Sequence, residues 1–275
     1  MDVMDSTTDL ELLKLYAESG IDETYGDAPH NFFEIKNNFL NAISGNSYRA
    51  GAADSGNGAV VGSGKSVAEQ KAALSIARAV EEAQKVASAA GSVAELCAGV
   101  RAFSLSPLSK FATNAITGVG VDNPKLLVIT DIPNSDEDRS GVVLSGATGE
   151  LLVKILSAIE CSVGTNTYTF PASFLRPAGG RVPTREELNI FTPFIKRFVE
   201  LLKPKFIMLM GAVPVEAVLG KTDAITSLCG KMFEYNGVPV MPTFSLNFLN
   251  NNKDAKRKVW QDLQTVIIPK LREVG

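Results

Sequence analysis

Apolar residues in the second half of the chain fall into short continuous runs separated by longer stretches of helical periodicity. The runs cover 125–130 (KLLVIT), 167–170 (TYTF) and 206–210 (FIMLM), and each is long enough for one buried strand. A strand pair is predicted over 232–241, because Asn236-Gly237 supplies the positive φ angles of a tight hairpin turn. Continuous apolar strands alternating with helices are typical of a parallel sheet covered on both faces.

Capping signals mark where several helices begin. Ser66, Ser92 and Thr184 each precede a glutamate by three residues, which is the capping-box spacing, and Pro214 suits the first turn of another helix. The first three signals begin predicted helices over about 67–90, 93–103 and 185–202, and two more helices are predicted over about 149–159 and 253–271. The expected fold class is therefore α/β, a three-layer α/β/α sandwich with a central, mainly parallel sheet.

The first 66 residues have a different character. Residues 9–18 show the pattern of a short amphipathic helix, whereas residues 44–66 are rich in glycine, serine and alanine and are typical of a flexible linker. We therefore divide the chain into an N-terminal helical segment (1–43), a flexible linker (44–66) and one α/β domain with leading helices (67–275). The core of that domain is expected over 92–275.

The composition of the chain argues against several kinds of functional site. The net charge is −3, with acidic side chains in excess over 1–100 and basic ones in excess over 151–275. Three cysteines without a close pair, and a single histidine at His30, argue against a disulfide framework, a zinc site or a histidine-based triad. No apolar run is long enough to span a membrane, and the acidic N-terminus lacks the pattern of a signal peptide, so we expect a cytoplasmic protein.

Four segments of the C-terminal half carry recognisable motifs in a fixed order. They are 131–152 (DIPNSDEDRSGVVLSGATGELL), 176–187 (RPAGGRVPTREE), 242–249 (PTFSLNFL) and 259–263 (VWQDL). These resemble GEAPGxxEDxxGxPFVGxAGxLL, CRPPxNRxPTxEE, PTYHPAYLLR and VWEDL, the motifs of the uracil-DNA glycosylase superfamily in its iron–sulfur (type 4) branch. The resemblance implies that family's fold, a DNA partner and a hydrolase of base-excision DNA repair.

Carried over residue by residue, the resemblance leaves few of the family's functional groups in place. It puts the catalytic acid at Asp131 and the histidine of the third motif at Ser245. The aromatic residue that stacks on uracil falls at Leu144, and the asparagine that reads the edge of uracil falls at Pro171, so stacking and hydrogen bonding to the base are both lost. The other pocket positions are Thr130, Ile132, Pro133, Asn134 and Asn247.

The iron–sulfur ligands implied by the resemblance are also replaced. The cysteine positions fall at Ser106, Leu175 and Phe191, with a fourth near Ser109. Cys97, Cys161 and Cys229 occupy none of these positions, and three thiols cannot complete a four-cysteine cluster. We therefore expect no iron–sulfur cluster, no other metal and no cofactor.

The resemblance leaves three hypotheses for function. The leading one is a degenerate glycosylase, a pseudoenzyme with little or no uracil excision, whose weak, sequence-independent DNA binding would use Arg176, Arg181 and Arg185 on the segment that faces DNA in relatives. The first alternative is an active DNA glycosylase of altered specificity, in which Asp131 positions water and Ser245 or Asn247 replaces the histidine. The second alternative is a structural scaffold that binds an unidentified protein.

Overall fold

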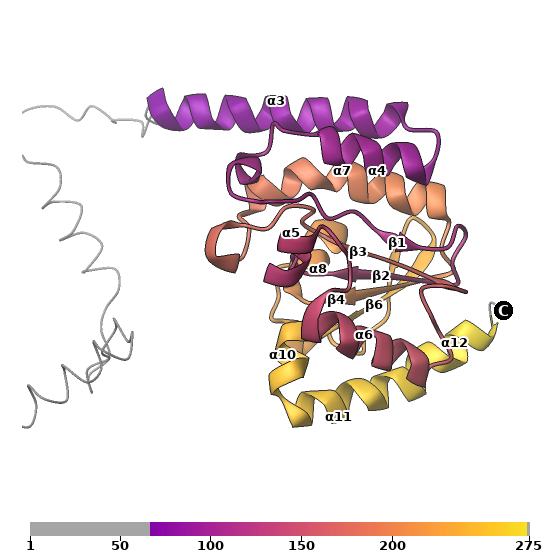
Figure 1. The fold of residues 1–275 in the computed structure, drawn as a ribbon. Helices are drawn as coiled ribbons and strands as arrows, with labels where there is room; N and C mark the ends of the chain where they lie inside the picture. Colours follow the sequence, from indigo (N-terminus) through magenta and orange to yellow (C-terminus); the bar gives the residue numbers. More distant parts are fainter. Residues whose placement is uncertain (1–66, 274–275) are drawn as a thin grey trace, which may run out of the picture. The chain divides into compact units, whose positions relative to one another are not determined.

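The computed structural model describes residues 67–273, which form a mixed sheet with helices on both faces (Figure 1). The predicted N-terminal helix and linker lie outside the described residues. The strands are β1 (Val119–Gly120), β2 (Leu126–Thr130), β3 (Thr167–Pro171), β4 (Phe206–Met210), β5 (Phe233–Tyr235) and β6 (Val238–Thr243).

Helices account for most of the remaining described residues. The longer ones are α3 (Val67–Ala89), α4 (Val93–Ala102), α6 (Gly146–Ala158), α7 (Arg185–Leu202), α8 (Ala212–Leu219) and α11 (Lys253–Asp262). The shorter ones are η1 (Pro107–Lys110), α5 (Ser135–Ser140), η2 (Ala178–Gly180), α9 (Ile225–Leu228), α10 (Leu246–Asn251), the π-helical turn η3 (Leu263–Ile267) and α12 (Ile268–Glu273).

The sheet has the order β1-β3-β2-β4-β6-β5. The four inner strands are parallel, and the two edge strands, β1 and β5, run antiparallel to their neighbours. The hairpin predicted around Asn236-Gly237 is confirmed as β5 and β6, with Asn236 and Gly237 at φ 51° and 80°. The parallel arrangement places the carboxyl ends of β2, β3, β4 and β6 at one edge of the sheet.

Successive residues of each central strand face opposite layers. Leu127 and Ile129 of β2 pack in the core that lies under α3, α4 and α7, whereas Leu126 and Val128 pack in the core under α6, α10 and α11. All four side chains are fully buried. The two helical layers lie above and below the sheet in Figure 1, which confirms the predicted α/β/α sandwich.

The predicted starts of α4 and α7 are confirmed by their caps. The Ser92 side chain accepts a hydrogen bond from the Glu95 amide, and Thr184 forms a capping box with Glu187. The helix predicted over 253–271 differs in its middle, where η3 interrupts it. Pro269 accounts for this, because it has no amide hydrogen and its ring collides with the carbonyl four residues earlier, so the helix loosens by one residue per turn there.

Among residues 67–273, the helices lack the combination of length and apolar character that crossing a membrane requires.

Candidate functional site

Asp131 directly follows β2, at the edge of the sheet where the carboxyl ends of the parallel strands meet. Ligands of open α/β sheets bind at this edge. The Val213 amide, in the first turn of α8, donates a hydrogen bond of 3.2 Å to Asp131 Oδ1. The carboxylate thus links the end of β2 to the helix that follows β4.

Gly211 leaves the space that the Asp131 side chain occupies. It follows β4 at φ 117°, and a Cβ atom placed on it would come within 1.9 Å of Asp131 Oδ1. An L-residue would be strained there by its backbone angle and excluded by the carboxylate. The Asp131 carboxylate can therefore lie here only because residue 211 is a glycine.

Burial and hydrogen bonding act on Asp131 in opposite directions. Desolvation is the larger effect and raises the pKa of this carboxyl to about 7, while hydrogen bonds from the Val213 amide and the Ser245 hydroxyl lower it in part. The group therefore changes its charge near neutral pH, which suits a residue that accepts or donates a proton.

Ser245 lies at the N-cap of α10, separated from the end of β6 by one residue. Its hydroxyl oxygen accepts a hydrogen bond of 3.3 Å from the Phe248 amide. The structure therefore brings together Asp131 and Ser245, the two predicted catalytic positions. Ser245 also has a capping role that the sequence comparison did not indicate.

A small cavity lies on one side of Asp131, where the resemblance places the uracil pocket. Its volume is about 30 Å³, which is room for a water molecule or two and far below the roughly 300 Å³ of a typical small-molecule site. Several predicted pocket residues do meet here: Thr130, Asp131, Ile132, Asn134, Leu144 and Asn247. Leu246, the first residue of α10, also lines the cavity.

Two predicted pocket residues lie elsewhere. Pro171 is buried at the end of β3, beside Thr130 in the ladder, and does not line the small cavity. Pro133 is buried as well, and its carbonyl accepts a hydrogen bond from Arg176. Both prolines therefore shape the backbone around the cavity.

Polar side chains around the small cavity form hydrogen bonds with the segments that line it. Asn134 caps α5, and its Nδ2 donates to the Ser145 carbonyl and to Thr148 Oγ1, each at 2.8 Å. Glu137 accepts hydrogen bonds from the amides of Asn134 and Leu144 at 2.9 and 2.8 Å. These contacts fix Leu144 over the cavity in a left-handed conformation, with φ 67°.

A second, larger cleft lies on the other side of Asp131. Its volume is about 350 Å³, and Asp131, Ser245 and Gly211 line it together with Glu216 of α8. The apolar part of its lining comes from Val182, Ala212, Val213, Ile225, Phe244 and Phe248. Sequence reasoning did not identify this cleft, because its residues come from separate segments and only Asp131 and Ser245 belong to motif positions that carry chemistry.

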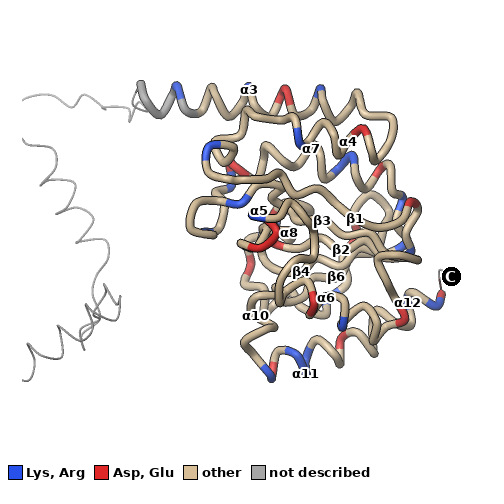
Figure 2. The backbone as a smooth tube through the Cα atoms, viewed as in Figure 1, with Lys and Arg blue, Asp and Glu red and all other residues tan. Residues whose placement is uncertain are grey.

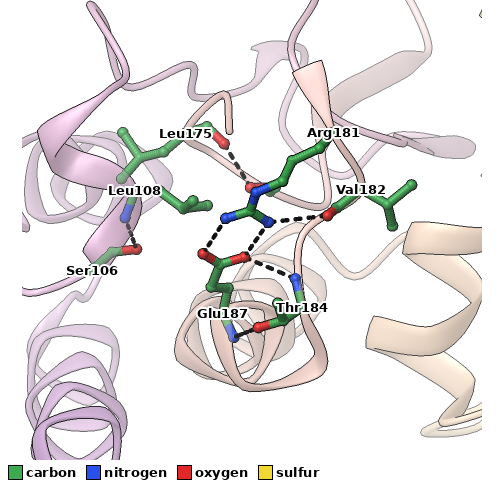
Figure 3. A network of polar contacts seen from close by, with 8 residues as sticks. Ser106, Leu108, Leu175, Arg181, Val182, Thr184 and Glu187 are labelled. Atoms are coloured by element: carbon green, nitrogen blue, oxygen red, sulfur yellow. Dashed lines mark hydrogen bonds and ion pairs between the residues drawn. The ribbon is translucent and has the colours of Figure 1, made fainter. Parts of the chain in front are cut away.

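The positions of the family's cluster ligands hold packed side chains. Ser106 is 3% exposed and accepts a hydrogen bond from the Leu108 amide, while Leu175 and Phe191 are 6% and 1% exposed in the apolar core. Figure 3 shows Ser106, Leu108 and Leu175 beside an ion pair between Arg181 and Glu187.

The three thiols are also placed apart from one another. All are buried and free, but Cys97 lies in the core on one face of the sheet, whereas Cys161 and Cys229 lie in the core on the other. Within residues 67–273, no group of three His, Cys, Asp or Glu side chains is arranged to hold a metal ion. The residues present therefore do not fit an iron–sulfur cluster.

Of the three predicted DNA-contacting arginines, two donate hydrogen bonds to other groups of the protein. Arg176 donates to the Pro133 carbonyl, and Arg181 forms two hydrogen bonds of 2.7 and 2.8 Å with the buried carboxylate of Glu187. Arg185 has a 67% exposed side chain and lies 4.0 Å from Glu216. A further group of basic residues begins α11 (Figure 2): Lys253, Lys256, Arg257 and Lys258.

Comparison with known proteins agrees with this architecture. The model of the Uracil DNA glycosylase superfamily matches residues 117–264. The type-4 uracil-DNA glycosylase of Thermotoga maritima is 28% identical over 171 residues, which cover 60% of this chain and 88% of that protein. The type-4 uracil-DNA glycosylase of Pyrobaculum aerophilum is 29% identical over 113 residues, which cover 41% of this chain and 57% of that protein.

A relative of another kind is a DNA polymerase of Bacillus phage SP01. It is 23% identical over 159 residues, which cover 58% of this chain but 17% of the polymerase. Because the superfamily match extends over more than half of the chain and includes the sheet and both cavities at its edge, this protein belongs to the uracil-DNA glycosylase superfamily.

Proposed function

We propose that this protein is a DNA-binding member of the superfamily with little or no uracil excision. The observation that carries the proposal is the 30 Å³ cavity at the expected uracil position, beneath Leu144 and Leu246. A uracil ring needs a larger space, and neither side chain offers an aromatic face or a hydrogen bond to the base.

Loss of the base-binding groups bears directly on the rate. Ser245 is a neutral donor where the family has a histidine, and removing one donor to developing negative charge costs about 10²–10³ in rate. Asp131 alone could orient water, but it does not replace stabilisation of the departing base. We therefore propose that Asp131 and Ser245 no longer support efficient cleavage of the glycosidic bond.

We also propose that the protein binds no iron–sulfur cluster. Leu175 and Phe191 at two of the ligand positions support this proposal, since an apolar side chain cannot coordinate iron, and the surviving thiols lie on opposite faces of the sheet.

DNA binding through phosphate contacts is the activity that we propose to be retained. Arg185 and the basic start of α11 are exposed, and Arg185 and Arg257 form their ion pairs, with Glu216 and Asp254, at the surface. Arg176 and Arg181 instead bond to partly or fully buried groups. Such contacts carry no sequence information, so affinity should fall with salt and vary little between sequences. The relatives' names, type-4 uracil-DNA glycosylase and DNA polymerase, support DNA as the partner.

The test is single-turnover excision on uracil-containing single- and double-stranded oligonucleotides, beside an active type-4 relative. We expect a rate at least ~10³-fold below that of the relative. The triple variant Leu144→Phe, Pro171→Asn and Ser245→His should raise the rate if loss of these groups is the cause. Robust turnover by the unmodified protein would overturn the proposal and favour a glycosylase that uses Asp131 and Ser245 in the larger cleft.

A further inference from the structure

The 350 Å³ cleft has the size and the mainly apolar lining of a ligand site. The small cavity at the expected uracil position is too small to be one. It opens at the carboxyl ends of β2, β4 and β6, and Asp131 lines both it and the small cavity. A ligand too large for the small cavity can therefore still reach Asp131 through the larger cleft.

The apolar walls suit a flat ring. Phe244 and Phe248 pack against each other with ring centroids 5.2 Å apart, and Lys258 Nζ lies 5.7 Å from the centroid of Phe244. Phe248 is 46% exposed and Val182 is 70% exposed, so each leaves much apolar surface in water beside the cleft. Covering that surface with an aromatic ring would be favourable, and a base stacks on any exposed aromatic face.

The polar groups in the cleft are mainly acceptors. Asp131 and Glu216 each contribute a carboxylate, which can only accept when ionised, and Ser245 and Thr226 each add a hydroxyl, which can accept or donate. Carboxylates in protein–DNA interfaces accept hydrogen bonds from the exocyclic amino group of cytosine, whereas the carbonyl at the same position of uracil would face another acceptor. The hydrogen-bond acceptors of the cleft therefore favour a ring that carries a hydrogen-bond donor at its edge.

Cations near the cleft point to an anionic ligand backbone. Lys258 belongs to the basic start of α11, and Arg185 lies beside Glu216 at 4.0 Å. A protein aromatic side chain would fill the walls equally well but would not use these cations. Single-stranded nucleic acid combines stacking rings with phosphates and fits both features.

Resting on the proposed DNA binding, we propose that this cleft binds an unpaired nucleobase that carries an exocyclic amino group, with cytosine as the simplest example. Phe248 would cover one face of the ring, and Asp131 would accept a hydrogen bond from the amino group. The site is thus a relocated base pocket that reads a donating edge.

The experiment compares fluorescein-labelled single-stranded dC and dU oligonucleotides of equal length, which differ only at the edge of the base. Binding of the full-length protein is measured by fluorescence anisotropy at low salt and pH 8, where Asp131, with its pKa of about 7, is mostly ionised. We expect the dC oligonucleotide to bind about fivefold more tightly or better, the lower end of the effect of one base-edge contact.

Variants separate the cleft from general DNA binding. Phe248→Ala should weaken dC binding about tenfold, as loss of one base–aromatic stack does, and Asp131→Asn should remove the preference for dC while leaving stacking intact. Phe111→Ala is the matched control, because Phe111 is 61% exposed and does not line the cleft. Circular dichroism establishes that each variant is folded.

The outcomes distinguish the two proposals. Equal, salt-sensitive binding of dC and dU that is unaffected by Phe248→Ala would overturn the base site and leave the proposed DNA binding standing. A preference for dU would overturn recognition of a donating edge. Absence of binding to either oligonucleotide would overturn both proposals. The cleft would then be better explained as a binding site for an aromatic side chain of another protein.

Discussion

At the scale of single residues, Asp131 combines a largely buried carboxylate with hydrogen bonds from the Val213 amide and the Ser245 hydroxyl. Its pKa is about 7 in the folded protein and near 3.8 in an unfolded chain, so the native state holds a proton that the unfolded state releases between these pH values. Stability therefore falls as the pH rises from 4 to 7, and the full cost of burying the charge is present above pH 7.

Asp131→Asn should remove this cost and keep the hydrogen bond from the Val213 amide. We expect the variant to be more stable than the unmodified protein by roughly 1–3 kcal/mol above pH 7, with the gain shrinking towards pH 4. Urea denaturation at several pH values measures the difference. An equal difference at all pH values would contradict this explanation.

The Arg181–Glu187 ion pair makes stability depend on pH in the opposite direction, so that its contribution is larger at neutral pH than in acid. The hydrogen bonds from Arg181 are the main cause that lowers the pKa of Glu187 below its ordinary value, and Glu187 is 7% exposed. A depressed carboxyl pKa adds stability above the unfolded pKa, and this contribution disappears as the pH falls through the folded value.

Arg181→Ala should lower the free energy of unfolding by about 1–3 kcal/mol at pH 7, because it leaves the buried Glu187 carboxylate without its partner. The loss should diminish in acid, where Glu187 is protonated in both variants. Arg185→Ala is the control and should change stability by less than about 0.5 kcal/mol, since its contact with Glu216 is long and exposed.

At the scale of elements, the segment from α5 to the start of α6 depends on a few side-chain contacts. Helix α5 has six residues and no buried side chain, so packing contributes little to it. Glu137 joins the two ends of the segment by accepting from the Asn134 and Leu144 amides. Burial raises the pKa of Glu137, and these amides lower it in part.

Glu137→Ala should therefore release this segment. We expect a loss of about 1–3 kcal/mol in stability and faster hydrogen exchange over 134–145, because two amides lose their acceptor and the capping box is broken. Glu150→Ala, an exposed position in α6, is the control. Unchanged exchange over 134–145 would show that Leu144 is held by packing alone.

The same segment illustrates where sequence-based prediction stops. The starts of α4 and α7 could be predicted from Ser92 and Thr184. A cap involves residues only three positions apart, so its signal can be recognised in the sequence alone. Helix α5 was not predicted, since residues 135–140 are entirely polar and show no apolar period. Strand β1 has two residues, too few for a pattern.

The candidate site divides in the same way. Asp131 and Ser245 could be located because each stands at a position of the motifs that resemble the family's, and each motif is a continuous stretch of sequence. The larger cleft could not, since Val182, Glu216 and Phe248 become neighbours only after the sheet has brought its strands together. Likewise, the internal role of Arg181 depends on the burial of Glu187, which the sequence pattern does not reveal.

At the scale of the whole molecule, apolar side chains pack at two of the positions where the resemblance places cluster ligands, Leu175 and Phe191. Leu108, Leu175 and Phe191 extend the core between the sheet and α7 to the positions of the expected ligands. The region should then be stable without metal, since burial of apolar side chains supplies the stabilisation that coordination would otherwise give.

Purified protein should accordingly be colourless, contain no stoichiometric iron and unfold at the same temperature with or without a chelator. Iron analysis after anaerobic purification and thermal denaturation are the measurements, with a type-4 relative purified in parallel as the positive control. Stoichiometric iron would mean that ligands outside the expected positions assemble a cluster.

The order of strands in the sheet bears on how the chain folds during synthesis. Strand β2 is completed first among the parallel strands, yet its two neighbours come much later, since Leu126 pairs with Thr167 on one side and with Phe206 on the other. Until β4 has been made, one edge of β2, which is apolar in four of its five residues, has no partner, and such edges promote aggregation. Truncation products that end before β4 should therefore aggregate most readily and depend most on chaperones. Synthesis of β4 supplies the missing partner of β2 and removes this exposed edge.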